Sequence, residues 1–235
     1  MMSNRHPERA ATPRAQHVTH RWPVISGIGA LVLTIGLGYM VLLRGTAESA
    51  DAGSLAIDRA WLAWIDRFRG PTLDLAALVL NYLGVGLTAS LLIPALIVGS
   101  LLAARRYWAA GYYLGATMLT GGAVQVLKHV FGRTRPADIL VTVDFGSFPS
   151  GHVANAAVMA TIFALLCPKF WVWALGAGYT LAMMLSRTYL GAHWLTDTIG
   201  AVLLGMGIAV VVWAPLAAKL DGENRLRRNR RSKRH

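Results

Sequence analysis

The sequence predicts an all-α integral membrane protein: a bundle of six membrane-spanning helices with one further helix at the membrane surface. Composition is the first observation behind this. Of 235 residues, 55% are apolar and 14% are charged, and the mean hydropathy is +0.47, whereas about a quarter of the residues in soluble domains are charged. The second observation is that the basic residues responsible for the net charge of +12 gather near the two chain ends, outside the apolar segments.

The first predicted span covers residues 24–43, an apolar run of the length that crosses a bilayer. This run is longer than the core of a typical signal peptide, so we expect a retained anchor. The small residues of "GTAESADA" (45–52) leave cleavage after the span as the alternative.

Residues 55–69 differ from a span because charged side chains interrupt them. Apolar residues recur every three or four positions and charged residues occupy the other positions: Ile57, Trp61, Ile65 and Phe68 against Asp58, Arg59, Asp66 and Arg67. This pattern predicts an amphipathic helix in the membrane interface, with part of a soluble loop as the alternative.

The apolar stretch from 72 to 104 is too long for one crossing, and Gly84, Gly86 and Pro94 interrupt it. We expect a short membrane-edge segment near 72–83. The remaining five spans are predicted near 86–104, 107–130, 152–167, 170–187 and 194–215. Tryptophans fall near the proposed span ends, as in aromatic belts: Trp22, Trp108, Trp171, Trp194 and Trp213.

Six spans place both termini on the same side of the membrane. With the termini in the cytoplasm, the inner segments hold fifteen Lys and Arg residues and the outer segments eight, which fits the positive-inside rule for an inner-membrane protein. We therefore expect basic cytoplasmic tails at 1–22 and 219–235 around a membrane domain at 23–218. The C-terminal tail is expected to contact anionic lipid headgroups, and no nucleic acid.

Three polar stretches lie at span ends on the predicted outer side: "KHVFGRTRP" (128–136), "PSGH" (149–152) and "SRTYLGAHWLTD" (186–197). Ionisable residues at such depths are costly and usually functional. Each stretch alone allows a plainer explanation, namely basic side chains that snorkel to headgroups, an interfacial histidine or a structural ion pair. Their common location favours a shared site.

The residue types predict that this site binds phosphate. Lys128, Arg135 and Arg187 are cations suited to phosphate oxygens. Ser150 and Gly151 are expected at the N-terminus of a helix, where free backbone N–H groups and the helix dipole attract an anion.

Two histidines and an aspartate add chemistry to the phosphate site. His193 and Asp197 are four residues apart, so on one helix they share a face and the carboxylate can orient the imidazole. We expect His193 to attack phosphorus and form a phosphohistidine, while His152 protonates the leaving oxygen and then activates water. The reaction needs no metal or other cofactor, because the carboxylates on the outer side are too scattered for a two-metal site.

The three stretches resemble the signature motifs of the type 2 phosphatidic acid phosphatase superfamily, which includes membrane lipid phosphatases and soluble vanadium haloperoxidases. The matching patterns are K-x6-R-P, P-S-G-H and S-R-x5-H-x3-D. The resemblance implies a helical bundle with an extracytoplasmic site. It also implies the same roles for the matching residues: phosphate binding by Lys128, Arg135, Ser150, Gly151 and Arg187, and catalysis by His152, His193 and Asp197.

The expected function is hydrolysis of a phosphorylated membrane lipid, with a polyprenyl diphosphate carrier as first choice. Phosphatidylglycerophosphate and phosphatidic acid are alternative substrates, and transfer of the phosphate to another acceptor is an alternative reaction. A haloperoxidase is disfavoured by the six spans. A non-enzymatic lipid-phosphate scaffold is disfavoured because both histidines and the aspartate are present.

Overall fold

The computed structural model describes residues 13–44, 53–84 and 87–232, and these residues form helices joined by turns and loops, with no strand among them. The predicted all-α class is therefore confirmed. The elements in chain order are α1 (Pro13–Arg44), α2 (Ala56–Ile65), the 3-10 turn η1 (Asp66–Phe68), α3 (Pro71–Leu83), the π-helical turn η2 (Thr88–Leu92), α4 (Ile93–Ala103), α5 (Tyr107–Phe131), α6 (Gly151–Leu166), α7 (Phe170–Tyr189) and α8 (Leu195–Ser232).

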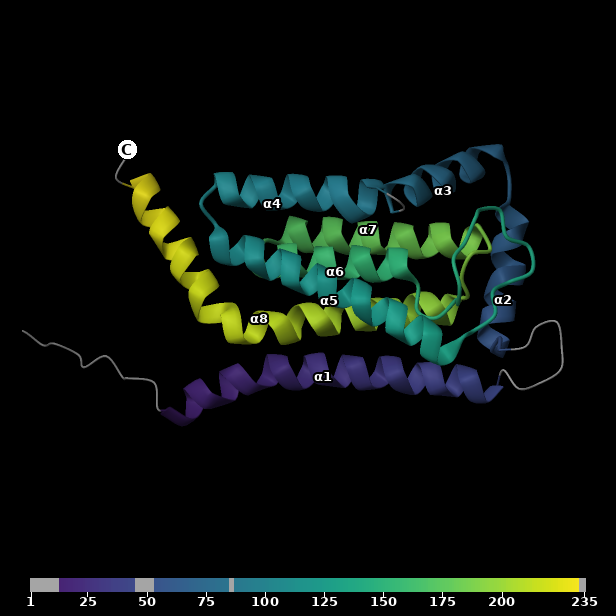
Figure 1. Ribbon diagram of the computed structural model, residues 1–235, viewed down its shortest axis with the longest axis horizontal. Helices are drawn as coiled ribbons and strands as arrows, with labels where there is room; N and C mark the ends of the chain where they lie inside the picture. The colour runs from purple at the N-terminus through teal and green to yellow at the C-terminus, as the bar shows by residue number, and fades with distance from the viewer. Residues whose placement is uncertain (1–12, 45–52, 85–86, 233–235) are drawn as a thin grey trace, which may run out of the picture.

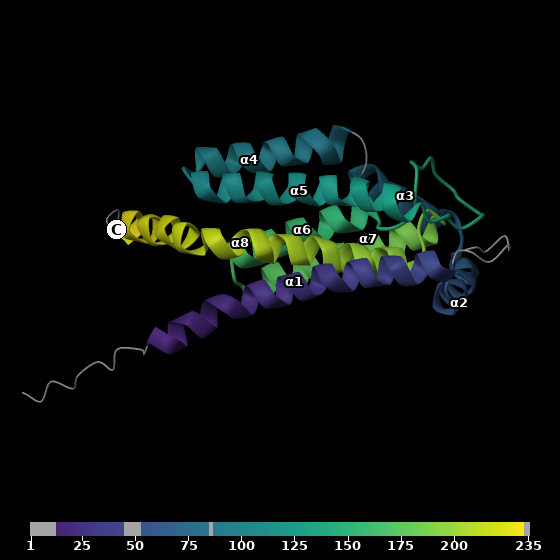
Figure 2. The same ribbon diagram turned by 60° about the horizontal axis from the view of Figure 1, so that its bottom comes forward.

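The long helices lie side by side as a bundle (Figures 1 and 2). Helix α8 packs against α1, α5 and α6, while α6 also packs against α7, and α4 lies along α5. Helix α2 crosses one end of this bundle, beside the long loop that joins α5 to α6 (Figure 1). A loop, a crossing helix and the ends of several long helices therefore lie together at that end of the bundle.

Small and apolar residues bring the central helices close together. One buried cluster joins α5, α6 and α8 through residues such as Tyr112, Ile162 and Ala209. A Cβ added at Gly205 of α8 would lie 2.6 Å from the carbonyl oxygen of Ala154 in α6, so only glycine permits this approach of two backbones. Such contacts between small residues are typical of helices that pack within membranes.

Large apolar side chains also cover the outward faces of the bundle. Leu75, Leu96, Met118 and Leu175 each expose about two thirds of their surface, from 65% to 71%. Among the described residues, the segments Trp22–Arg44 and Leu195–Leu226 are long and apolar enough to cross a membrane, and α3, α4 and α6 are shorter apolar helices. The count of six spans stays a prediction.

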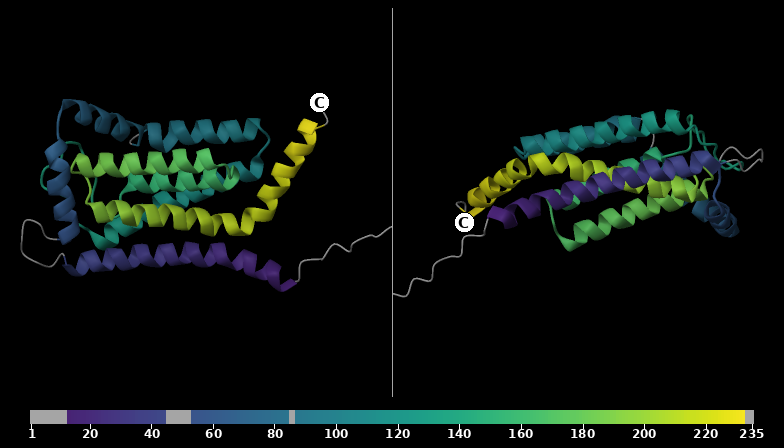
Figure 3. Two further views of the ribbon diagram at one scale, coloured as in Figure 1. Left: turned by 180° about the vertical axis from the view of Figure 1, so that it is seen from behind. Right: turned by 90° about the horizontal axis from the view of Figure 1, so that it is seen from below.

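The last helix is longer than the sequence suggested. We expected the final span to end near 215, but α8 continues through Pro215 to Ser232. A proline removes one backbone hydrogen bond and bends a helix without having to end it, and the C-terminal part of α8 turns away from the bundle (Figure 3).

Two expectations about exposure were wrong. Asp58 was placed on the exposed polar face of the helix at 55–69, but it is buried, with 1% of its surface exposed. Trp194 was placed in an aromatic belt, but it is also buried and donates its indole N–H to the carbonyl of Thr134. Both residues serve contacts between chain segments, which periodicity along one helix does not reveal.

Candidate active site

The structure brings all eight predicted site residues to the end of the bundle that α2 crosses (Figure 1). They come from the last turn of α5 and the loop after it, the first turns of α6 and α8, the last turn of α7, and the turn between α7 and α8: Lys128, Arg135, Ser150, Gly151, His152, Arg187, His193 and Asp197. The polar groups of three separate sequence stretches thus face one region.

A carboxylate lies between two of the predicted phosphate-binding cations. Both oxygens of Asp144 accept hydrogen bonds from the ammonium of buried Lys128, at 2.7 Å each. Arg135 donates from Nη2 to the same carboxylate, also at 2.7 Å. Burial alone would raise the pKa of Asp144, but the charges of Lys128 and Arg135 outweigh it and lower that pKa below its ordinary value. The two cations therefore hold an anion supplied by the chain itself.

Several donors at this end of the bundle are buried and have no hydrogen-bond partner. They are Nε of Arg135, Nε of Arg187, Oγ of Ser150 and Nε2 of His152. Buried polar groups are nearly always paired in folded proteins, so each unpaired group calls for an explanation. Four such groups from three chain segments, together with the ammonium of Lys128, fit an oxyanion with several acceptor oxygens.

Arg187 is held by a residue that the sequence analysis did not single out. Its Nη1 donates to the side-chain oxygen of Asn81 in α3. The signal for Asn81 was a lone amide within the apolar residues 75–83. The end of α3 also touches the site at Gly84, where an added Cβ would lie 2.5 Å from Cδ2 of His152.

His193 lies in the turn before α8 and is oriented differently from the prediction. We expected His193 and Asp197 on one helical face, joined by a hydrogen bond. Instead Nδ1 of His193 donates to the carbonyl oxygen of Ser147 at 2.8 Å, while the nearest oxygen of Asp197 is 3.6 Å away. The reason is that α8 begins at Leu195, so the four-residue spacing spans a turn and not a helix.

This orientation leaves Nε2 of His193 as the nitrogen with the lone pair, which accepts a hydrogen bond from Arg135. Nε2 lies 3.3 Å from Nη1 of Arg135, so a phosphate held by Arg135 would sit beside it. Burial lowers the pKa of His193 to about 4, against the opposing effect of Asp197. The imidazole is therefore neutral near pH 7, as a nucleophile has to be.

Asp197 is enclosed by donors that the motifs did not identify. It accepts hydrogen bonds from Arg133, from the hydroxyl of Ser147, and from the backbone N–H of Trp194 at 2.9 Å. Arg133 also pairs with Asp58, whose carboxylate lies 2.6 Å from it. The signal for Arg133 was a third basic residue between Lys128 and Arg135, but nothing in the sequence connects it to Asp58.

Metal ligands do not gather at this site. Over the described ranges, no group of three or more His, Cys, Asp and Glu side chains is arranged to hold a metal ion.

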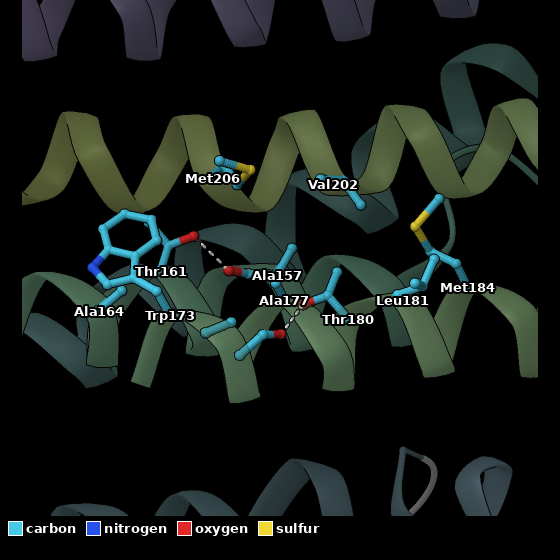
Figure 4. A pocket seen from close by; sticks show the side chains of 12 residues that line it. Ala157, Thr161, Ala164, Trp173, Ala177, Thr180, Leu181, Met184, Val202 and Met206 are labelled. Atoms are coloured by element: carbon cyan, nitrogen blue, oxygen red, sulfur yellow. Dashed lines mark hydrogen bonds between the residues drawn. The ribbon is translucent and has the colours of Figure 1, made fainter. Parts of the chain in front are cut away.

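Two cavities lie further along the bundle. One of about 260 Å³ is lined by α6, α7 and α8, with Trp173 and Met206 in its wall (Figure 4). The hydroxyls of Thr161 and Thr180 that line it are bonded to carbonyls of their own helices, so its surface is effectively apolar. A second cavity of about 330 Å³ lies between α4, α5 and α6 and reaches Gly151 at the start of α6. The second cavity thus extends as far as one predicted phosphate-binding residue.

Comparison with known proteins gives one consistent family. Residues 107–219 match the model of the PAP2 superfamily. A lipid A 1-phosphatase of Porphyromonas gingivalis is 38% identical over 96 residues, which cover 40% of this chain and 20% of the relative. Phosphatidylglycerophosphatase B of Bacillus subtilis is 33% identical over 93 residues, covering 35% of this chain and 45% of the relative. The matched segments thus span less than half the length of these two curated relatives.

Solved structures agree with these sequence matches. A transmembrane PAP2-type phosphatidylglycerolphosphate phosphatase from Bacillus subtilis superposes with a TM-score of 0.67 at 24% identity, over 80% of this chain and 94% of that one. The crystal structure of Aquifex aeolicus LpxE superposes with a TM-score of 0.60 at 27% identity, over 68% and 96% of the two chains. The resemblance that the three motifs suggested is confirmed: residues 107–219, which contain all three motifs, match the PAP2 superfamily, and the chain shares the fold of these phosphatases.

Proposed function

We propose that the chain is a metal-independent membrane phosphatase that removes phosphate from a lipid phosphate or diphosphate through a phosphohistidine. The observation that carries this proposal is the meeting of unpaired buried donors, cations and a neutral His193 at one end of an apolar bundle. Its PAP2 relatives support it, since those with printed activities act on phosphorylated lipids.

The proposed reaction has two steps. Nε2 of His193 attacks the terminal phosphorus, the bond between that phosphorus and the leaving oxygen breaks, and His152 gives its proton to that oxygen. The leaving oxygen belongs to the lipid in a monophosphate and to the lipid monophosphate in a diphosphate. His152 then takes a proton from water, which attacks the phosphohistidine and frees His193 and inorganic phosphate. Lys128, Arg135 and Arg187 neutralise the charge on the phosphoryl oxygens in both steps, which is the larger part of catalysis in phosphoryl transfer.

In this scheme Asp197 acts on His193 at Nδ1, the ring nitrogen that does not attack. Its carboxylate lies 3.6 Å from Nδ1 of His193 and favours the positive charge that develops on the ring during attack. The carbonyl of Ser147 holds the same nitrogen directly. Ser150 and Gly151 contribute donors from the N-terminus of α6.

The proposed substrate reaches the site from the bilayer. Its chains would occupy the cavity between α4, α5 and α6, which ends at Gly151, and its phosphate would displace Asp144 from the cations. A polyprenyl diphosphate carrier remains our first choice, and a relative named putative undecaprenyl-diphosphatase YbjG from Escherichia coli supports it, at 31% identity over 40% of this chain and 52% of that relative. Lipid A phosphorylated at position 1 is the second candidate, favoured by the relative from Porphyromonas gingivalis.

The test is phosphate release by the purified full chain from a panel of lipids. The panel holds a polyprenyl diphosphate, a polyprenyl monophosphate, lipid A, phosphatidylglycerophosphate and phosphatidic acid. We expect release from at least one lipid, no effect of EDTA, and loss of activity in His193→Ala. Full activity of that variant, or loss of activity in EDTA, would contradict the proposal.

We further propose that both termini are cytoplasmic and that the site faces outward across the inner membrane. The excess of Lys and Arg in the inner segments supports this orientation. An outward site suits a carrier lipid whose phosphate is removed outside the cytoplasm.

A further inference from the structure

Asp58 is a buried carboxylate in α2, an element outside the three sequence motifs. Its Oδ2 lies 2.6 Å from Nη2 of Arg133. Its Oδ1 accepts hydrogen bonds from the backbone N–H and from the hydroxyl of Thr196, both at 2.9 Å. Asp58 thus binds both the loop after α5 and the first turn of α8.

Arg133 has every side-chain nitrogen engaged. Nε and Nη2 donate to the carbonyl oxygen of Gly53 at 3.1 and 2.9 Å, and Nη2 also donates to Asp58. Nη1 donates to the hydroxyl of Thr196 at 2.8 Å and to Oδ1 of Asp197. The guanidinium is therefore held in one orientation, with one carboxylate on each side.

This arrangement is costly for the fold. Asp58 and Asp197 are buried together with Arg133, so two negative charges share one positive charge away from water. Buried ion pairs seldom stabilise a protein more than well-packed apolar residues of the same volume. Oδ2 of Asp58 also accepts the backbone N–H of Leu55 at 3.1 Å at the start of α2, but an uncharged side chain could serve that contact. The buried charges therefore point to a role in the reaction.

The contacts of Asp197 show what this role is. Arg133 fixes Oδ1 of Asp197, while Ser147 and the N–H of Trp194 fix Oδ2, the oxygen that faces Nδ1 of His193. Asp58 holds Arg133 in place and also holds Thr196, the residue before Asp197. Removing the charge of Asp58 would therefore loosen Asp197 from two sides.

We propose that Asp58 is a positioning residue that acts through Arg133 and Asp197 to orient His193 for attack. It has no contact with the cations Lys128, Arg135 and Arg187, so it governs the rate of the chemical step and not the binding of phosphate. The inference rests on the proposed phosphatase function, and it gives α2 a place in the active site.

The test compares Asp58→Asn with the wild type on a lipid that the wild type hydrolyses, with orthophosphate as a competitive inhibitor. The amide keeps the size of the side chain but loses its charge. We expect kcat to fall by about tenfold or more, because small misplacements of reacting groups cost that much. KM and the inhibition constant of orthophosphate should stay within about twofold, because the phosphate-binding groups are untouched.

Two further variants make the result specific. Asp66→Asn is the matched control: Asp66 lies one residue after α2 and pairs with Arg69 instead of the site, so its kcat should equal that of the wild type. Asp58→Glu restores the charge on a longer arm, and its kcat should lie above that of Asp58→Asn.

Three outcomes would overturn the proposal. One is an unchanged kcat in Asp58→Asn. Another is that folded Asp58→Asn loses affinity for orthophosphate by the same factor as it loses kcat. If Asp58→Asn does not fold, Thr196→Val replaces it in the test, because it removes the hydroxyl that links Asp58 to Arg133 at nearly constant volume. An unchanged kcat in Thr196→Val is the third outcome. A wild type that releases no phosphate from any lipid contradicts the proposed function instead.

Discussion

His193 is neutral at physiological pH because of where it lies. The ring is buried, and burial disfavours its charged form more than Asp197 favours it, which brings the pKa from 6.5 to about 4. Arg187 and Arg135 lower the pKa further by repelling a proton on the ring. The nucleophile is thus available without a base to deprotonate it.

Because His193 is neutral, we can predict how kcat/KM changes as the pH falls. A nucleophile with a lowered pKa stays active as the pH falls, until the pH approaches that pKa. We therefore expect the acid limb of kcat/KM that belongs to His193 to lie below pH 6.5. The measurement uses a monophosphate and a diphosphate lipid, because a limb at the same pH with both belongs to the enzyme and not to the substrate. A shared limb at or above pH 6.5 would contradict the assignment.

The position of Asp144 leads to a second prediction, which concerns substrate binding. Its carboxylate occupies Lys128 and Arg135, so a substrate phosphate has to displace it. An ion pair with one exposed partner is worth less than about 1 kcal/mol, and Asp144 is 59% exposed at its side chain. We expect Asp144→Asn to lower KM by about two- to fivefold.

The control for Asp144 is Asp138→Asn, at an exposed position of the same loop. Its KM should not change. If Asp144→Asn raises KM, Asp144 orients the two cations for the substrate and does not compete with it.

At the scale of elements, α2 and α3 place the motif residues although neither carries a motif. Helix α3 supplies Asn81 to Arg187 and ends at Gly84 against His152. Helix α2 supplies Asp58 to Arg133 and to the first turn of α8. Within the described residues, both helices therefore support the polar site.

The close contact between the end of α3 and His152 leads us to expect that Gly84→Ala loses activity. In Gly84→Ala the new methyl group would meet His152, and the backbone of Gly84 is in a conformation that alanine tolerates, with φ −101°. The imidazole must move, so we expect kcat to fall by about tenfold. Gly99→Ala in α4 is the control, because nothing lies within 4 Å of an added Cβ there. Wild-type kcat in Gly84→Ala would show that His152 moves without consequence.

At the scale of the whole molecule, orientation in the membrane follows from charge and is open to direct test. The chain has one cysteine, Cys167, so Cys167→Ser gives a background without thiols. Leu140→Cys in the loop after α5 and Leu226→Cys in α8 then place single thiols at exposed positions at opposite ends of the bundle. A membrane-impermeant maleimide should label position 140 in intact cells, and position 226 only after permeabilisation. The reverse pattern would overturn the proposed topology.

The sequence by itself determined the helical class, the approximate positions of the helices and the resemblance to the PAP2 superfamily. Apolar runs and residue spacing are local properties, and the three motifs lie within residues 128–197. Predicted helix ends agreed closely with the structure except at the start of α1, which begins at Pro13 and not near residue 24, and at the end of α8, where the proline bent the helix without ending it.

Only the tertiary structure decided how the motif residues are held. Asp58 and Arg133 are 75 residues apart in the chain, and the charges around Asp58 suggested an exposed helical face. Ser147 holds His193 through a backbone carbonyl, which no residue type encodes. Burial and long-range contact depend on how the helices pack, so residue order alone could not place these groups around the site.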